Sequence, residues 1–171
     1  EDGRERDFEM RWTLPLAPGA RFEPEAETRD GMLSGTKPRA AVFPLALPEW
    51  RTDPRVGELA VEENRLTLTH HCRGRQFCCP LLLDLKPNRV TKQRTWRQLA
   101  VAESLKVQPH DVAVGFRAQC GKDQWLFYRS LADAANRTVL GQNLSGEFYA
   151  GRFLKTGEVD EFIEIETDED D

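Results

Sequence analysis

Apolar and polar residues alternate with a period of two along most of this chain. The alternation begins over residues 8–16 and is clearest over 112–120, where Arg117 and Gln119 separate apolar neighbours. Such a period places apolar side chains on one face of an extended strand and polar ones on the other. The same pattern, or a short apolar run between turn residues, predicts strands over 21–23, 31–33, 39–47, 57–61, 65–72, 76–85, 124–130, 147–153 and 159–166.

Turn residues separate these segments at short intervals. Glu62-Glu63-Asn64 and Gly121-Lys122-Asp123 each lie between two predicted strands, which is typical of antiparallel sheets. Pro44 cannot donate to a ladder, so the segment 39–47 is predicted to be an edge strand or a bulged strand. We therefore predict an all-β fold, an antiparallel β-sandwich or open barrel with at most one short helix.

The segment 95–106 fits two interpretations. Trp96, Leu99 and Ala100 have helical spacing, whereas Leu99 and Val101 have the spacing of a strand. Both alternatives stay open from the sequence, and the strand is slightly favoured.

The length of the chain predicts one domain. With 171 residues, of which 39% are apolar, the chain can close a single core. We expect a β-rich domain over 1–167 and a solvated acidic tail over 168–171. No apolar run approaches the roughly 18 residues that cross a bilayer, so neither a membrane span nor a signal peptide is expected.

Charge is distributed unevenly around a formal net value of −5. Residues 158–171 include nine acids and no base, whereas residues 86–97 include five bases and no acid. The five bases are Lys86, Arg89, Lys92, Arg94 and Arg97. These two segments could attract each other within one molecule or between molecules.

Histidine and cysteine residues form the most suggestive chemical cluster. A hairpin turning at 73–75 would bring His70, His71 and Cys72 beside Cys78 and Cys79, and imidazole and thiolate are the ligands that zinc prefers. The five residues between Cys72 and Cys78 do not match a zinc knuckle, so no metal is predicted. Ordinary strand cysteines are the favoured interpretation, and a disulfide from Cys72 to Cys78 or Cys79 is the alternative. Free thiols indicate a cytoplasmic protein, and paired ones a secreted or periplasmic protein.

Catalytic and cofactor motifs are absent from the sequence. No serine lies in a nucleophile elbow, and His110-Asp111 after Pro109 is typical of a turn. No glycine-rich phosphate loop follows a strand, so no cofactor is predicted. Glu23, Glu25 and Glu27 could share one face of a strand, but neighbouring acids are usually a solvated surface.

Three classes of binding function follow from the remaining features. The favoured hypothesis is a non-catalytic module that binds a protein partner or a second copy of itself, with an enzyme less favoured. Its predicted contact residues are Lys86, Arg89, Lys92, Arg94, Trp96, Arg97 and Trp50. A carbohydrate-binding module or carbohydrate-active enzyme using exposed Trp50 or Trp96 is the first alternative. Nucleic-acid binding through residues 86–97 is the second, and the acidic net charge disfavours it.

Overall fold

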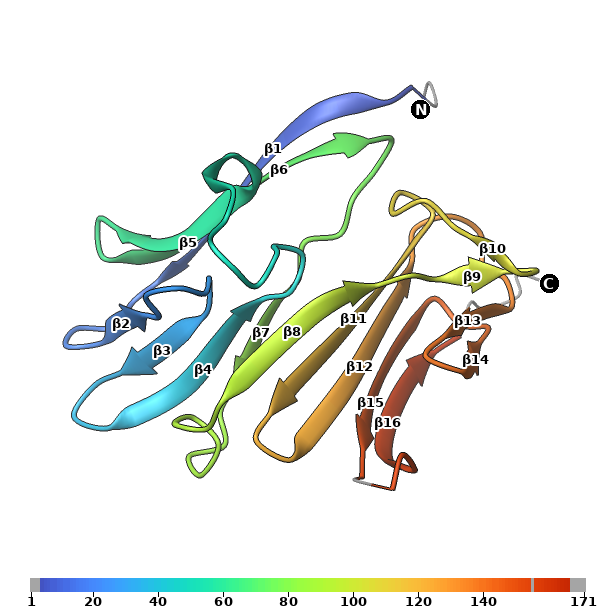
Figure 1. The fold of residues 1–171 in the computed structure, drawn as a ribbon. Helices are drawn as coiled ribbons and strands as arrows, with labels where there is room; N and C mark the ends of the chain where they lie inside the picture. Colours follow the sequence, from blue (N-terminus) through green and yellow to red (C-terminus); the bar gives the residue numbers. More distant parts are fainter. Residues whose placement is uncertain (1–3, 155, 167–171) are drawn as a thin grey trace.

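The chain folds almost entirely into antiparallel strands. The computed structural model describes residues 4–154 and 156–166. Over these residues it contains sixteen strands in four antiparallel sheets that do not close into a barrel, and one short 3-10 helix, η1 (Pro54–Val56) (Figure 1). The prediction of an all-β, sandwich-like fold is confirmed. The predicted tail over 168–171 lies outside the described residues.

The first sheet has the order β1 (Arg6–Pro15), β6 (Arg65–Gly74) and β5 (Gly57–Glu62). β1 and β6 pair along their whole length, with Arg6 opposite Gly74 and Pro15 opposite Arg65. Glu63 and Asn64 form the predicted turn between β5 and β6, and both have positive φ angles, of 47° and 60°. A left-handed pair of this kind matches the twist of a tight hairpin.

The second sheet has the order β2 (Arg21–Pro24), β3 (Gly31–Ser34), β4 (Pro38–Pro44) and β7 (Leu81–Asp84). β4 is an interior strand that is buried on both faces, so the expectation of an edge position was wrong. Pro44 is tolerated because it is the last residue of the strand. β4 does bulge, but at its other end, where the register with β3 shifts between Leu33 and Ser34.

The third sheet is the largest, and the fourth is small. The third has the order β16 (Val159–Ile165), β15 (Phe148–Phe153), β12 (Asp123–Ser130), β11 (Ala113–Cys120) and β8 (Arg94–Leu99). The fourth has the order β10 (Lys106–Val107), β9 (Ala102–Glu103), β13 (Arg137–Val139) and β14 (Gln142–Leu144). The ambiguous segment 95–106 contains no helix: it forms β8 and β9 and then a turn at Ser104 and Leu105, so the slightly favoured strand is confirmed over 95–99 and 102–103.

Three hydrophobic clusters join these sheets in succession. The cluster between the first and second sheets contains Leu16, Val42, Leu47, Leu59, Leu66 and Leu68. The cluster between the second and third contains Ala41, Phe43, Leu45, Trp96, Val114, Phe116, Ala118 and Cys120. The cluster between the third and fourth contains Val101, Ala113, Leu126, Tyr128, Val139, Leu144 and Tyr149. β4 supplies side chains to the cluster between the first and second sheets and to the cluster between the second and third sheets. It therefore packs against the first sheet with one face and against the third sheet with the other.

Membrane-spanning helices are not found in the part of the chain that the structure describes, because none of its helices is long and apolar enough.

Candidate functional site

Trp50 lies on the loop between β4 and η1, here called the Trp50 loop (residues 48–53). Trp50 is 54% exposed. The backbone of this loop pairs with a second loop: Arg29 N donates to Glu49 O at 2.9 Å, and Arg51 N donates to Glu27 O at 3.0 Å. An isolated β-bridge joins Thr28 to Trp50. Two loops that are distant in the sequence therefore support each other beside the exposed indole.

Arg29 holds the Trp50 loop from inside the protein. Its side chain has no exposed surface. Its guanidinium donates to four carbonyl oxygens, those of Gly57 at 3.1 Å, Pro48 at 2.9 Å, Asp53 at 2.6 Å and Trp50. The planar group carries five N–H donors in a fixed geometry, so one side chain can fix several turns of the backbone. Burial lowers the pKa of Arg29, and the negative charge of Glu58 opposes this effect.

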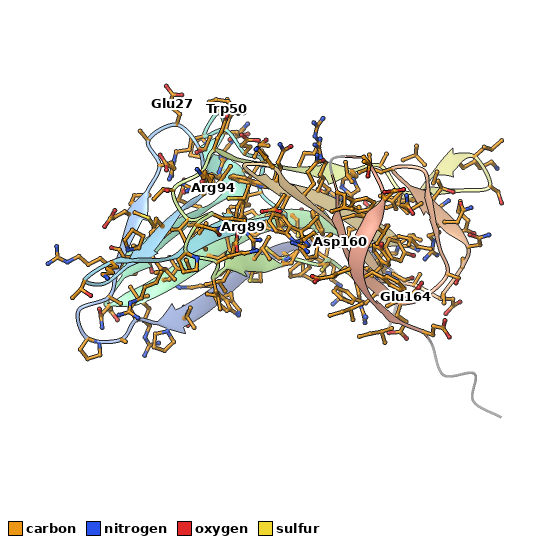
Figure 2. The ribbon with its side chains drawn as sticks, turned by 90° about the horizontal axis from the view of Figure 1, so that it is seen from below. Glu27, Trp50, Arg89, Arg94, Asp160 and Glu164 are labelled. Carbon is orange, nitrogen blue, oxygen red and sulfur yellow. The ribbon has the colours of Figure 1, made fainter. Side chains whose placement is uncertain are left out.

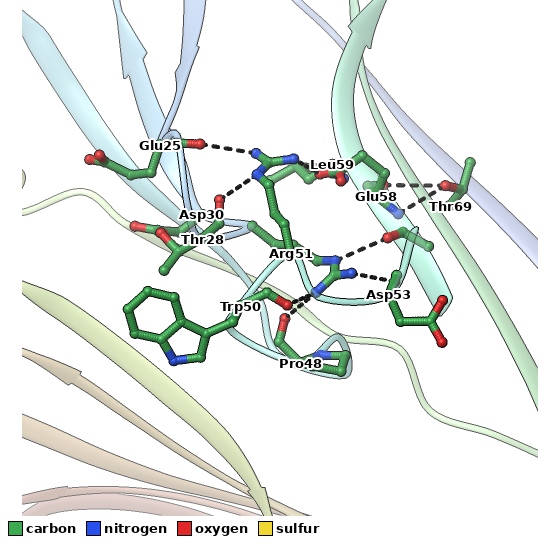
Figure 3. Close-up of polar contacts among 12 residues, drawn as sticks. Glu25, Thr28, Asp30, Pro48, Trp50, Arg51, Asp53, Glu58, Leu59 and Thr69 are labelled. Atoms are coloured by element: carbon green, nitrogen blue, oxygen red, sulfur yellow. Dashed lines mark hydrogen bonds and ion pairs between the residues drawn. The ribbon is translucent and has the colours of Figure 1, made fainter. Parts of the chain in front are cut away.

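Arg51 holds the same region from the other side. Its Nε donates to Thr28 O at 2.8 Å, its Nη2 donates to Glu25 O at 3.2 Å, and its Nη1 pairs with Glu58 (Figure 3). The two arginines together restrict the backbone that carries Trp50. The indole is thus presented on a loop that is already ordered before any ligand arrives.

A cavity of about 630 Å³ opens beside Trp50, and we call it the Trp50 cleft. Its lining combines four acids with two bases, namely Glu23, Glu25, Asp30, Glu49, Lys92 and Arg94. Four negative and two positive charges give a net charge of −2. The rest of the wall includes apolar side chains and uncharged polar ones, such as Met32, Thr28 and Gln93.

Arg94 organises the floor of the cleft. Its Nε contacts Asp30 Oδ2 and its Nη2 contacts Glu25 Oε1, each at 2.5 Å, and its Nη1 donates to Val90 O at 2.7 Å. The side chains of Arg94 and Asp30 are almost fully buried, whereas half of the Glu25 side chain is exposed. Thr28 Oγ1 also donates to Asp30 Oδ1 at 2.5 Å. An ion pair buried this well is held in one geometry, which makes the polar floor rigid.

Glu49 connects the cleft to the edge of the third sheet. Its carboxylate accepts from Thr95 Oγ1 at 2.5 Å and from Trp96 N at 3.3 Å. Trp96 is 2% exposed, and its indole N–H donates to Leu47 O at 2.8 Å. Trp96 therefore belongs to the core and does not offer a surface for a ligand, and Glu49 accepts one backbone N–H at the free edge of β8.

The other bases of the segment 86–97 do not form one surface. Arg89 is paired with Asp84 at 2.6 Å and lies over the Trp125 ring, with 4.7 Å from its guanidinium carbon to the ring centre. Lys86 and Arg97 are exposed outside the cleft. In the view of Figure 2, Arg94 lies between Trp50 and Arg89, and of these two arginines only Arg94 lines the Trp50 cleft. The partner-binding role of these residues stays a prediction, but only Lys92, Arg94 and Trp50 meet at one site.

The histidine and cysteine residues do not gather around a common point. Cys78 packs on the cluster between the second and third sheets, whereas Cys79 packs on the cluster between the first and second. His71 is exposed, and His70 is half-buried with its ring 6.5 Å from that of Phe77. Among the described residues, no three His, Cys, Asp or Glu side chains are placed to share a metal ion.

All four cysteines lie in the described part of the chain as free thiols, so the alternative of a disulfide is not realised. Burial raises the pKa of Cys79 to about 12, with a smaller contribution from Cys78 and Cys72. A thiol with so high a pKa is a poor nucleophile and a poor metal ligand. These residues serve as apolar packing groups.

The sequence identified part of this site. Trp50 stands out in the sequence because it lies between charged residues in a loop, and the structure shows that it is exposed. Arg29 and Asp30 were missed. The partners of Arg29 are carbonyl oxygens, which every residue has, so no pattern of side chains marks them. The contact of Glu25 with Arg94 joins residues that lie 69 positions apart in the sequence, so no local pattern reveals it.

No protein-family model, curated protein sequence or solved structure matches this chain significantly.

Proposed function

We propose that this chain is a non-catalytic binding module and that the Trp50 cleft binds a neutral carbohydrate chain. The observation that carries this proposal is the exposed indole of Trp50 on a braced loop beside a polar cavity of about 630 Å³. An indole offers a flat apolar face on which the C–H face of a sugar ring can stack. Convergent polar groups beside such a face are typical of ligand sites.

The polar groups of the cleft suit hydroxyl ligands. A sugar hydroxyl both donates and accepts hydrogen bonds, and the cleft offers carboxylate acceptors in Glu23 and Glu25 beside the donors Lys92 and Gln93. A net charge of −2 along the lining disfavours phosphate, sulfate and carboxylate groups in the ligand. A neutral chain is therefore the better fit.

Binding without hydrolysis is favoured by how the cleft carboxylates are used. Cleavage of a glycosidic bond needs two carboxyl groups that face the scissile bond across a gap, one of them donating a proton. Asp30 and Glu25 both contact Arg94, and Glu49 accepts from Thr95. These interactions hold the carboxylates as fixed acceptors in the wall.

Nucleic-acid binding through residues 86–97 is the weaker hypothesis. A phosphate backbone is held by bases whose charge is free to meet it. Arg89 pairs with Asp84, and Arg94 pairs with Asp30 and Glu25. Of the two bases that line the Trp50 cleft, Lys92 alone forms no ion pair with a described residue.

Affinity electrophoresis through gels containing soluble polysaccharides tests this proposal. We expect at least one neutral polysaccharide to retard the protein, and polysaccharides rich in sulfate or uronate groups not to do so. Trp50→Ala should weaken the retardation by at least about tenfold, because stacking on the indole is lost. Trp12→Ala is the matched control, since Trp12 is also exposed but lies on β1, and it should leave binding unchanged.

Two results would contradict the proposal. One is equal binding by Trp50→Ala and the unchanged protein. The other is binding of tetramethylammonium that is lost in Trp50→Ala, without any binding of neutral saccharides, because a negatively charged aromatic cleft could instead select a cation.

A further inference from the structure

β16 exposes large apolar side chains at the border of the third sheet. Phe162 is 62% exposed, Ile163 65% and Ile165 51%. Among the described strands, β16 pairs with β15 alone, so its outer backbone N–H and C=O groups are not used by another strand. Native proteins normally cover or block such an edge, because it is a template for another chain. At the opposite edge of this sheet, Trp96 N of β8 donates to the Glu49 carboxylate of the Trp50 loop.

Apolar surface continues inward from β16. Phe148 lies opposite Ile165, and Ala150 lies opposite Ile163. Phe148 also lines an apolar cavity of about 310 Å³ with Phe77, Phe127 and Leu131 among its other walls. The edge strand therefore adjoins a pocket that could receive an apolar side chain from a bound segment.

The charge of β16 is strongly negative. Arg152 contacts Asp160 and Glu161 and so offsets part of this charge. Glu164 forms no ion pair with any described residue. It lies opposite Tyr149, whose pKa is raised by burial and, to a smaller extent, by this carboxylate. Figure 2 shows Asp160 and Glu164 on β16, well away from Trp50.

We propose that β16 binds an extended, basic segment of a protein partner as an added strand. Backbone hydrogen bonds would supply affinity, and alternate side chains would meet Ile163 and Ile165 on one face and Phe162 and Glu164 on the other. A second copy of β16 fits poorly. Antiparallel pairing about Phe162 would set Asp160 opposite Glu164 of the second copy, and like charges in that position are destabilising.

Binding of a short peptide of alternating lysine and valine, measured by fluorescence anisotropy, tests this inference. We expect binding that weakens as salt is raised, and none for the matching peptide of glutamate and valine. N-methylation of alternate peptide bonds on the lysine peptide should weaken binding by at least about tenfold, because the methyl groups block edge hydrogen bonds.

Variants locate the binding surface. Ile163→Lys and Glu164→Lys should each weaken binding of the lysine peptide by about threefold to tenfold. Val61→Lys on β5, which is also an edge strand with an exposed apolar residue, is the matched control and should have no effect. Trp50→Ala should bind the peptide normally, which separates this inference from the proposed carbohydrate site.

Three results would overturn the inference. They are no peptide binding at concentrations up to about 1 mM, binding that is indifferent to N-methylation or to Glu164→Lys, and a dimer in sedimentation that Ile163→Lys dissociates. The last result would assign the edge to a second copy.

Discussion

The Trp50 loop and β16 both expose large apolar side chains, but the chain holds them in different ways. The buried guanidinium of Arg29 donates to three carbonyl oxygens of the Trp50 loop and to a fourth just beyond it, at Gly57. Arg51, within the loop, donates to two carbonyl oxygens of the neighbouring loop. β16 is held by the ladder to β15 and by the contacts of Arg152 with its acids.

This difference separates two kinds of recognition. A braced loop loses little conformational freedom when a ligand binds, so it suits a small rigid surface such as a sugar ring. An open strand edge offers a row of backbone hydrogen-bonding groups and some freedom of register, so it suits an extended segment of polypeptide. Exposure alone would have placed the two regions in one class, and the supporting contacts distinguish them.

Arg29→Met should have the largest effect of any single change proposed for the Trp50 loop. Methionine fills part of the volume but leaves four carbonyl oxygens without the donor that they now have. We expect the free energy of unfolding to fall by about 3–5 kcal/mol, measured by urea denaturation. Carbohydrate retardation in affinity gels should be lost as well.

Arg51→Met is the control for this change. Its guanidinium bonds to two carbonyl oxygens and its side chain is partly exposed, so water can replace it. We expect the free energy of unfolding to fall by less than half as much as in Arg29→Met. Equal losses for the two variants would mean that Arg29 has no special role in bracing the loop.

Gly57→Ala should destabilise the chain just after the Trp50 loop, where η1 meets β5. Gly57 has a φ of +130°, and a Cβ there would collide with the carbonyl oxygen of Thr69 on β6. We expect a loss of about 2–4 kcal/mol in the same denaturation assay. Gly19 has a φ of +80° but open space around it. Gly19→Ala therefore reports backbone strain alone, and its free energy of unfolding should fall by only about 1 kcal/mol. Equal losses would contradict the predicted collision.

Much of the fold could be predicted from the sequence, because alternation and turn residues act locally. The β5–β6 turn at Glu63 and Asn64 and the β11–β12 hairpin lie where the pattern placed them. The position of β4 could not be predicted in this way. Pro44 excludes one hydrogen bond at one residue, and whether a strand is interior depends on which distant strand reaches it, here β7.

The candidate site was less accessible to sequence reasoning. Trp50 stands out because its neighbours Glu49 and Arg51 are polar. Trp96 looked equally suitable, since it lies among bases, yet it is buried by the second sheet and its N–H bonds to Leu47 O. Burial of an aromatic residue is decided by the packing of sheets, and a single strand's sequence does not contain that information.

His70 offers a pH test of the region behind the Trp50 loop, with an effect smaller than that of Gly57→Ala. His70 lies opposite Gly57 on β6. Burial lowers its pKa below the usual 6.5, and the neighbouring His71 adds to this effect. The unfolded chain therefore takes up a proton more readily than the folded one as pH falls below about 6.5, and stability should decline over that range.

His70→Gln should reduce this decline, because glutamine does not titrate. Denaturation midpoints measured between neutral and mildly acidic pH report the difference, and the exposed His110→Gln provides the control. Parallel pH profiles for the unchanged protein and His70→Gln would contradict the assignment. No matching change is expected from substitutions on β16.

Ile163→Lys should have the smallest effect on stability, which sharpens the contrast with the Trp50 loop. Ile163 is mostly exposed on an edge strand, and the lysine stem can cover the same apolar surface while its charge meets the acids of β16. We expect the free energy of unfolding to change by less than about 0.5 kcal/mol in urea denaturation. Val61→Lys, on the edge strand β5, should change the free energy of unfolding by a similarly small amount. A loss above about 1.5 kcal/mol for Ile163→Lys alone would mean that this face of β16 is covered in the free protein, and strand addition would then need a prior opening step.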